Sequence, residues 1–203
     1  MLKLRWTRRL LEWGSLASLV AVVAISQAAS ATSNVSIDFE SLALDEFVTT
    51  QFADQQVLFG NAVTLVAGIS LNEIDFPPSS GTNVISGLDV GPIGVAFLQP
   101  AHFVAFSITT ADTAVVRYYD ATATLLGQSV IDANLGATSQ IAFNTPSQQI
   151  SGLTIGRLNA DDSTGSAFFL TVDDFQAAIP EPSAFLAMAL GLIPIAAAVR
   201  RRA

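Results

Sequence analysis

Between residues 32 and 179 the apolar residues come in short runs with a period of two, and no long stretch has the spacing of an amphipathic helix. In the first run, Val35, Ile37 and Phe39 fall on one face of an extended chain. Gly, Pro, Asn, Asp and Ser separate the runs at intervals of about 8–12 residues, the spacing of turns in all-β proteins. The pattern predicts an all-β fold, a single antiparallel β-sandwich resembling a jelly roll.

The expected strands can be read from the runs directly. They cover residues 35–39, 57–59, 62–66, 93–98, 103–108, 113–119, 123–131, 140–143, 150–155 and 167–175. Residues 120–122 (Asp-Ala-Thr) predict a hairpin between two of them, and Gln99-Pro100 predicts another turn. The segments 70–91 and 159–166 are rich in turn-forming residues and are expected to be loops.

The first 31 residues have the three parts of a secretory signal peptide in order. Four basic residues lie between Lys3 and Arg9, residues 16–25 form an apolar core, and residues 29–31 (Ala-Ser-Ala) offer a cleavage site. We therefore expect a signal helix that signal peptidase removes, so that the mature chain begins at Thr32. The alternative is an uncleaved membrane anchor.

The last 24 residues show a second ordered pattern. The triplet Pro180, Glu181, Pro182 comes first, an apolar run of 16 residues covers 184–199, and the basic cluster Arg200, Arg201, Arg202 follows. A helix of this length rises about 24 Å, less than the hydrocarbon core of about 30 Å, but thinning of the bilayer or snorkelling of the arginines lets it span. We expect a transmembrane helix in the inner membrane with the arginines on the cytoplasmic side.

This tail resembles the PEP-CTERM sorting signal of exported bacterial proteins, which has the same three parts in the same order. The resemblance implies recognition by exosortase, a membrane protease, and cleavage near the Pro-Glu-Pro triplet during export. It also implies a mature protein at the cell surface or in the extracellular matrix. The alternative is a tail anchor that is never processed.

The two ends divide the chain into a signal peptide (1–31), a sandwich domain (32–175), a linker with the triplet (176–182) and the sorting helix with its basic tail (183–203). Of nine basic residues, only Arg117 and Arg157 lie between the two ends, together with 15 of the 17 acidic residues. The exported domain therefore carries about 13 net negative charges. This charge disfavours nucleic acid and anionic membrane surfaces as partners.

The sequence offers little for catalysis. His102 is the only histidine and the chain has no cysteine, so it cannot build a Cys/His pair or a multi-histidine metal site. No Gly-x-Ser-x-Gly motif is present, and His102 opens a predicted strand beside Pro100, a structural position. A pair of carboxylates for glycoside hydrolysis stays open, because 15 acids single out no pair. We expect a protein that is not an enzyme.

Three segments resemble the β-sandwich domains found ahead of this sorting tail, and also carbohydrate-binding jelly rolls. They are IDFESL at residues 37–42, RYYDATATLLGQ at 117–128 and FFLTVDDF at 168–175. The resemblance implies that the first and last strands lie side by side and that a calcium ion can lie between them.

The acids on those two strands suit calcium, which prefers six to eight oxygen ligands. Asp38 and Glu40 share one face of the first predicted strand, and Asp173 and Asp174 lie at the end of the last. Adjacent strands would bring the four carboxylates together, and a structural calcium ion would relieve their repulsion. The alternative is that the acids are solvated and protect sheet edges from aggregation. The aspartates of loop 159–166 are lesser candidates.

Glycan binding is a further hypothesis, since the C–H faces of sugars stack on aromatic rings. Both tryptophans lie in the signal peptide, which leaves Tyr118 and Tyr119 as the amphipathic rings of the domain. As neighbours in a strand, they are predicted to face opposite ways. Phe76, beside two prolines, is another candidate platform.

Two functions follow from the sequence. The first is a non-catalytic protein of the cell surface or of an exopolysaccharide matrix, delivered by the sorting tail. The alternative is a glycan-binding module or adhesin.

Overall fold

The computed structural model describes residues 32–88, 90–145 and 149–180. The predicted signal peptide lies outside these residues, and so does the sorting tail apart from Pro180. Residues Ser33–Pro180 form one compact unit. Within the described residues, no helix has the length and apolar character needed to cross a membrane.

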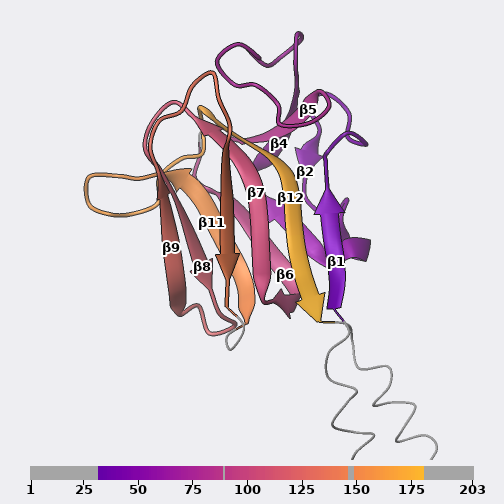
Figure 1. Ribbon diagram of the computed structural model, residues 1–203, viewed down its shortest axis with the longest axis vertical. Coiled ribbons are helices and arrows are strands. Elements are labelled where there is room, and N and C mark those ends of the chain that lie inside the picture. Colours follow the sequence, from indigo (N-terminus) through magenta and orange to yellow (C-terminus); the bar gives the residue numbers. More distant parts are fainter. Residues whose placement is uncertain (1–31, 89, 146–148, 181–203) are drawn as a thin grey trace, which may run out of the picture. The chain divides into compact units, whose positions relative to one another are not determined.

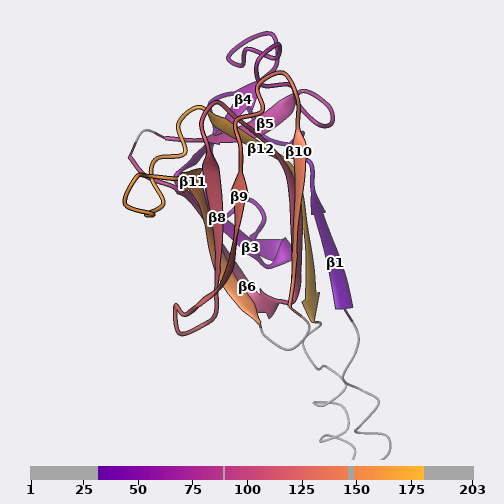
Figure 2. The same cartoon turned by 60° about the vertical axis from the view of Figure 1, so that its left-hand side comes forward.

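The unit consists of two antiparallel sheets that pack face to face, as Figures 1 and 2 show. One sheet contains β1 (Thr32–Ile37), β2 (Phe47–Val48), β4 (Ala62–Val66), β5 (Asn83–Gly87), β7 (Phe103–Thr110), β10 (Ser139–Asn144) and β12 (Leu170–Pro180). Its order is β10-β7-β12-β5-β4-β2, and β1 also pairs with β12.

The second sheet has five strands. They are β3 (Val57–Gly60), β6 (Ile93–Ala101), β8 (Ala114–Tyr119), β9 (Leu125–Ile131) and β11 (Ile150–Arg157). Their order is β3-β6-β11-β8-β9, and a short 3₁₀ helix, η1 (Ala53–Gln55), precedes β3. The all-β sandwich predicted from the sequence is confirmed.

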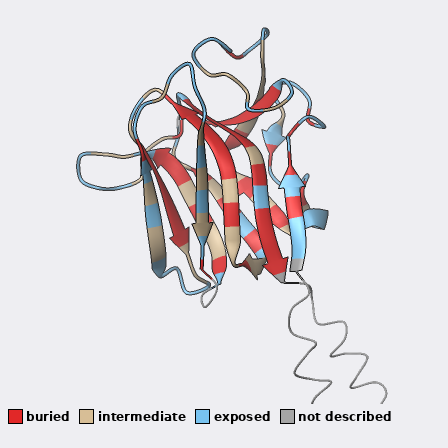
Figure 3. Cartoon of the chain, in the orientation of Figure 1, coloured by how far each residue is buried: buried red, intermediate tan, exposed pale blue. Residues whose placement is uncertain are grey.

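The core lies between the sheets and follows the predicted alternation (Figure 3). Val35, Ile37 and Phe39 are all buried, as the first run predicted. Phe39 packs edge-to-face against Phe59, with 5.7 Å between the ring centroids. Burial of these large apolar side chains is the main source of stability in a domain without disulfides.

The first and last strands lie side by side, as the resemblance to jelly rolls implied. Their arrows run in opposite directions in Figure 1, so β1 begins and β12 ends at the same end of the sandwich. β12 continues to Pro180 and pairs with β7 through Gln176 and Ala178. Residues 176–180, which we expected to belong to a linker, thus complete the sheet, and residues 181 and 182 of that linker lie outside the described residues.

The turn at residues 120–122 is confirmed, since β8 and β9 pair on either side of it. The turn expected at Gln99-Pro100 is wrong. Both residues belong to β6, and the chain turns at His102, where it crosses from one sheet to the other. Pro100 fits in β6 because the register with β11 shifts between Ala96 and Ala101, so the missing N–H removes no ladder bond there.

The loop expected at residues 70–91 contains a strand, β5, which lies between β12 and β4 and is buried along its whole length. The pattern concealed it because Asn83 and Ser86, on opposite faces of this strand, are polar although both are buried. The Asn83 side-chain amide donates to the carbonyl oxygen of Leu42 at 3.0 Å, and the Ser86 hydroxyl donates to that of Leu170 at 2.7 Å. These bonds satisfy polar groups whose burial without a partner would destabilise the fold.

Candidate functional site: a hollow on the five-stranded sheet

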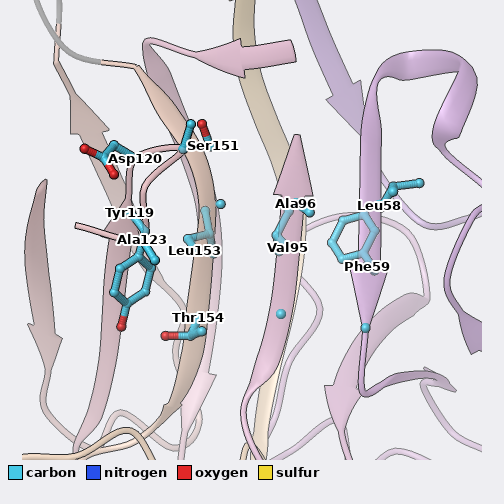
Figure 4. Close-up of a pocket in the computed structure, with 14 residues that line it drawn as sticks. Leu58, Phe59, Val95, Ala96, Tyr119, Asp120, Ala123, Ser151, Leu153 and Thr154 are labelled. Atoms are coloured by element: carbon cyan, nitrogen blue, oxygen red, sulfur yellow. The ribbon is translucent and has the colours of Figure 1, made fainter. Parts of the chain in front are cut away.

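A hollow of about 530 Å³ opens on the outer face of the five-stranded sheet. Four neighbouring strands, β3, β6, β11 and β8, supply its floor, as Figure 4 shows. Side chains alternate along each strand, so the residues between the core positions are the ones that face the hollow.

The floor is shallow because glycine or alanine occupies four positions in two adjacent rows across the sheet. One row runs Gly60, Gly94, Thr154, Arg117, and the next runs Leu58, Ala96, Gly152, Tyr119. A Cβ atom added to Gly60 or to Gly94 would meet no other atom within 4 Å. The hollow therefore exists because side chains are missing at these positions.

Two aromatic residues, Phe59 and Tyr119, line the hollow, but Phe59 is buried in the core, where its ring packs against Phe39. Tyr119 is therefore the aromatic residue that can offer its ring to a ligand. It is the last residue of β8, and alternation directs its ring outward while Tyr118 is fully buried in the core. Tyr119 is half-buried, and in Figure 4 its ring extends from β8 towards Thr154 of β11. The prediction that the two tyrosines face opposite ways is confirmed.

Two hydroxyl groups line the same hollow without a hydrogen-bond partner. Ser151 Oγ and Thr154 Oγ1 are buried, and neither has a donor or acceptor within reach among the described residues. Buried polar groups are normally paired, so each such group requires an explanation. Because both residues belong to the lining of the hollow, a ligand bound there is a candidate partner for these hydroxyls.

The β8–β9 turn forms one wall of the hollow, through Asp120, Ala121 and Ala123. Asp120 Oδ1 accepts hydrogen bonds from the Thr122 amide and hydroxyl, both at 2.8 Å, and from the Thr124 amide at 2.9 Å. The bonds from the Thr122 hydroxyl and the Thr124 amide lower the pKa of Asp120. The carboxylate is therefore charged at neutral pH.

Arg117 lies beside the hollow in the same row as Thr154. Its guanidinium donates to Thr164 Oγ1 at 2.6 Å, to Gln128 Oε1 at 3.2 Å and to the carbonyl oxygen of Asp162, and it pairs with the Asp162 carboxylate at 3.3 Å. These bonds hold the loop 158–166 over the next row of the sheet, where a Cβ on Gly156 would collide with that loop. The guanidinium of Arg117 is thus occupied by partners within the fold.

The described residues that line the hollow include one carboxylate, Asp120. Glycoside hydrolysis needs two carboxyl groups on opposite sides of the scissile bond. An aromatic ring, hydroxyls and a single acid suit binding better than catalysis.

The overall arrangement is similar to that of carbohydrate-binding modules. A family 29 carbohydrate-binding module superposes with a TM-score of 0.42 and a sequence identity of 7%. The match covers 73% of this chain and 90% of that module. A family 6 module superposes with a TM-score of 0.36 and an identity of 13%, over 71% of this chain and 93% of that module. The K3 cleaved adhesin domain of Lys-gingipain from Porphyromonas gingivalis superposes with a TM-score of 0.41 and an identity of 12%, over 73% of this chain and 99% of that domain.

These likenesses concern the strand arrangement, and at such identities and TM-scores they carry no argument about a ligand. No protein-family model matches the chain. No curated protein matches it either. The hollow itself is therefore the feature from which a ligand can be inferred.

Three of the four acids proposed for calcium accept hydrogen bonds from one loop, residues 79–83. Glu40 accepts from the backbone amides of Thr82 and Asn83 at 2.8 and 2.7 Å. Asp38 accepts from the Glu40 amide at 3.2 Å. β1 ends at Ile37, so Asp38 and Glu40 follow the strand instead of sharing its face as we expected.

Asp173 and Asp174 contact the same loop from a bulge within β12. Asp173 Oδ2 accepts from the amides of Ser79 and Ser80 at 2.7 and 2.9 Å, and Asp174 Oδ1 accepts from the Ser80 hydroxyl at 2.6 Å. In the described part of the chain, no three acidic or histidine side chains are grouped so that they could hold a metal ion. Calcium binding at these four acids stays a prediction from the sequence.

His102 and Phe76 lie apart from the residues that line the hollow. His102 is half-buried at the corner between β6 and β7, where its backbone bonds to Ala178 and Thr145. Phe76 is half-buried in the segment before β5. Sequence reasoning missed the floor of the hollow, whose only signal is Gly60 and Gly94 at positions that alternation assigns to an outer face.

Proposed function

We propose that this protein is an exported, non-catalytic surface protein whose sandwich domain binds glycan chains in the hollow of its five-stranded sheet. The observation that carries the proposal is a half-buried tyrosine ring beside two unpartnered hydroxyls, over a floor of glycines. A sugar ring presents flat C–H faces and a rim of hydroxyls. Tyr119 offers a surface for the faces, and Ser151, Thr154 and Asp120 offer partners for the rim.

The extent of the hollow favours a chain over a single sugar. Its floor crosses four strands, which span about 14 Å at the usual spacing between strands. This length exceeds that of one sugar ring. A polysaccharide or oligosaccharide laid across the strands would contact Tyr119 at one side and Leu58 at the other.

The sequence patterns of the two ends support a proposed route to the surface. Signal peptidase would cleave before Thr32, and exosortase would process the tail near Pro180, Glu181 and Pro182. Mass spectrometry of the mature protein from its host tests this route. Termini near Thr32 and the triplet would support it, whereas an intact Arg200–Arg202 cluster would leave a tail anchor.

The binding proposal is tested on residues 32–180, which contain both sheets and their core. We expect saturable binding to at least one neutral oligosaccharide on a glycan array, verified by titration calorimetry. Tyr119→Ala should weaken this binding by about tenfold or more, because a stacked ring contributes about 1.4 kcal/mol or more. Tyr119→Phe keeps the ring and should retain most of the affinity.

Phe168 is the matched control, because it is an exposed aromatic residue outside the hollow. Phe168→Ala should leave the affinity unchanged. Equal losses in Tyr119→Ala and Phe168→Ala would place the binding elsewhere. A purely structural role in the matrix predicts no saturable binding by any variant, and that result would overturn the proposal.

A further inference from the structure

The charges around the hollow bear on which glycans it accepts. Asp120 lies in its wall and uses Oδ1 for all three hydrogen bonds that hold the β8–β9 turn. Those bonds fix the position of the carboxylate and leave its second oxygen to face solvent or ligand. A glycan in the hollow therefore lies next to a fixed negative charge.

Among the residues that the structure describes, no arginine or lysine forms an ion pair with Asp120. Residues 32–180 contain two such cations, Arg117 and Arg157. Arg117 is buried and directs its guanidinium to Asp162, Thr164 and Gln128. Arg157 pairs with Asp112 at 3.7 Å on the surface. Acidic sugars are usually bound by Arg or Lys in bidentate or charge-assisted hydrogen bonds, and both arginines are already engaged.

We propose that the hollow selects glycans without acidic groups and that Asp120 is the residue that excludes uronic acids. The proposal rests on the glycan-binding function proposed above. A uronate carboxylate next to Asp120 would add a like-charge repulsion, which is appreciable at the partly exposed wall of the hollow. A neutral sugar avoids that repulsion and can instead donate a hydroxyl hydrogen to Asp120 Oδ2.

The test uses matched pairs of hexasaccharides. Each pair consists of a neutral β-1,4-glucan, β-1,4-mannan or β-1,3-glucan hexamer and its counterpart in which every C6 hydroxymethyl is oxidised to a carboxylate. We expect residues 32–180 to bind at least one neutral hexamer and to bind its oxidised counterpart about threefold to tenfold more weakly at low salt. The difference should shrink at high salt, because salt screens the repulsion.

Asp120→Asn keeps an oxygen that accepts from the turn but removes the charge. It should bring the affinities of the two hexamers of a pair closer together. Asp132→Asn, which removes an exposed acid outside the hollow, should leave their ratio unchanged. The proposal is overturned by an oxidised hexamer that binds as tightly as the neutral one, or by equal effects of the two variants. If no hexamer of any kind binds, both the proposed glycan-binding function and the proposed selectivity for neutral glycans are overturned.

Discussion

Tyr118 and Tyr119 are consecutive residues of β8, and the sheet separates their rings. Tyr118 is fully buried and stacks on Phe143, with 4.0 Å between the ring centroids and 5° between the ring planes. Tyr119 lines the hollow on the opposite face. One strand thus directs the same residue type once into the core and once into the candidate site, so the two positions separate stability from binding.

We predict opposite phenotypes for truncation of these tyrosines. Tyr118→Ala should lower the free energy of unfolding by about 3–5 kcal/mol, since it leaves a cavity and an unpaired Phe143 ring. Tyr119→Ala should change that free energy by less than about 1 kcal/mol, as is usual for surface substitutions. Urea unfolding followed by circular dichroism measures both values. Comparable destabilisation by the two variants would show that Tyr119 belongs to the core.

The glycines give a second prediction, because a side chain added at some of them would enter open space, whereas at others it would collide with a neighbouring residue. Gly94→Val adds a side chain where a Cβ meets nothing within 4 Å, so the fold should tolerate it while glycan binding is lost. Gly87→Ala should cost about 1–3 kcal/mol, since its Cβ would collide with Ala167. Thermal melts and binding titrations separate the two effects, with Ala142→Val on the other sheet as the control. Undiminished binding by Gly94→Val would move the site away from this floor.

The sequence predicted those parts of the fold that depend on alternation. Local periodicity predicted that Val35, Ile37 and Phe39 share a buried face, and this is confirmed. Turn chemistry predicted the hairpin at residues 120–122, which is also confirmed. β5 was missed because its buried polar groups are satisfied by distant carbonyl oxygens, such as that of Leu170 for Ser86. Such partners come from segments far away in the chain.

The candidate site was predictable only in part. Alternation within β8 placed Tyr119 opposite Tyr118, and the hairpin at residues 120–122 indicated β9 as one neighbour, but nothing local could indicate the strands on the other side of β8. Gly60, Gly94 and Thr154 come together only through the register of four strands. Glycines at outer-face positions are the only local sign of a hollow defined by absent side chains, so the hollow becomes visible only once the sheet is assembled.

The two arginines of the domain give a third prediction, because they differ in burial. Arg117→Met removes the donors that hold the loop 158–166 and should cost about 1–3 kcal/mol. Arg157→Met removes an ion pair whose two side chains are more than half exposed, and should cost about 0–1 kcal/mol. Hydrogen exchange should quicken in the loop for Arg117→Met alone. Equal exchange in both variants would contradict the assigned role of Arg117.

Calcium binding remains a prediction that a melting curve decides. An ion at Asp173 and Asp174 would have to compete with the hydrogen bonds that these acids already accept from Ser79 and Ser80. If the prediction holds, calcium raises the melting temperature of residues 32–180, chelator lowers it, and Asp174→Asn removes the response. A melting temperature that ignores both calcium and chelator would leave the loop donors as the partners of these acids.

Asp173 gives a prediction about pH. The residue is 3% exposed, and this burial raises the pKa of the carboxyl above its ordinary value although three backbone amides donate to it. The folded state therefore binds this proton more readily than the unfolded state. Its contribution to stability is fully present below the unfolded pKa of about 3.9 and is lost as the pH rises through the folded pKa.

Asp173→Asn removes this titration. At neutral pH it should cost about 1–3 kcal/mol, because Asn has one accepting oxygen where Asp173 uses two. If that oxygen accepts from Ser79 and Ser80, the NH₂ group of Asn meets the Asp174 N–H and cannot accept from it. The difference in unfolding free energy between wild type and variant should be largest at about pH 4 and should shrink as the pH rises through the folded pKa of Asp173. Urea titrations between about pH 4 and 7 measure this trend. A difference that grows with pH would instead mean that the three amides outweigh burial and hold the pKa of Asp173 below its ordinary value.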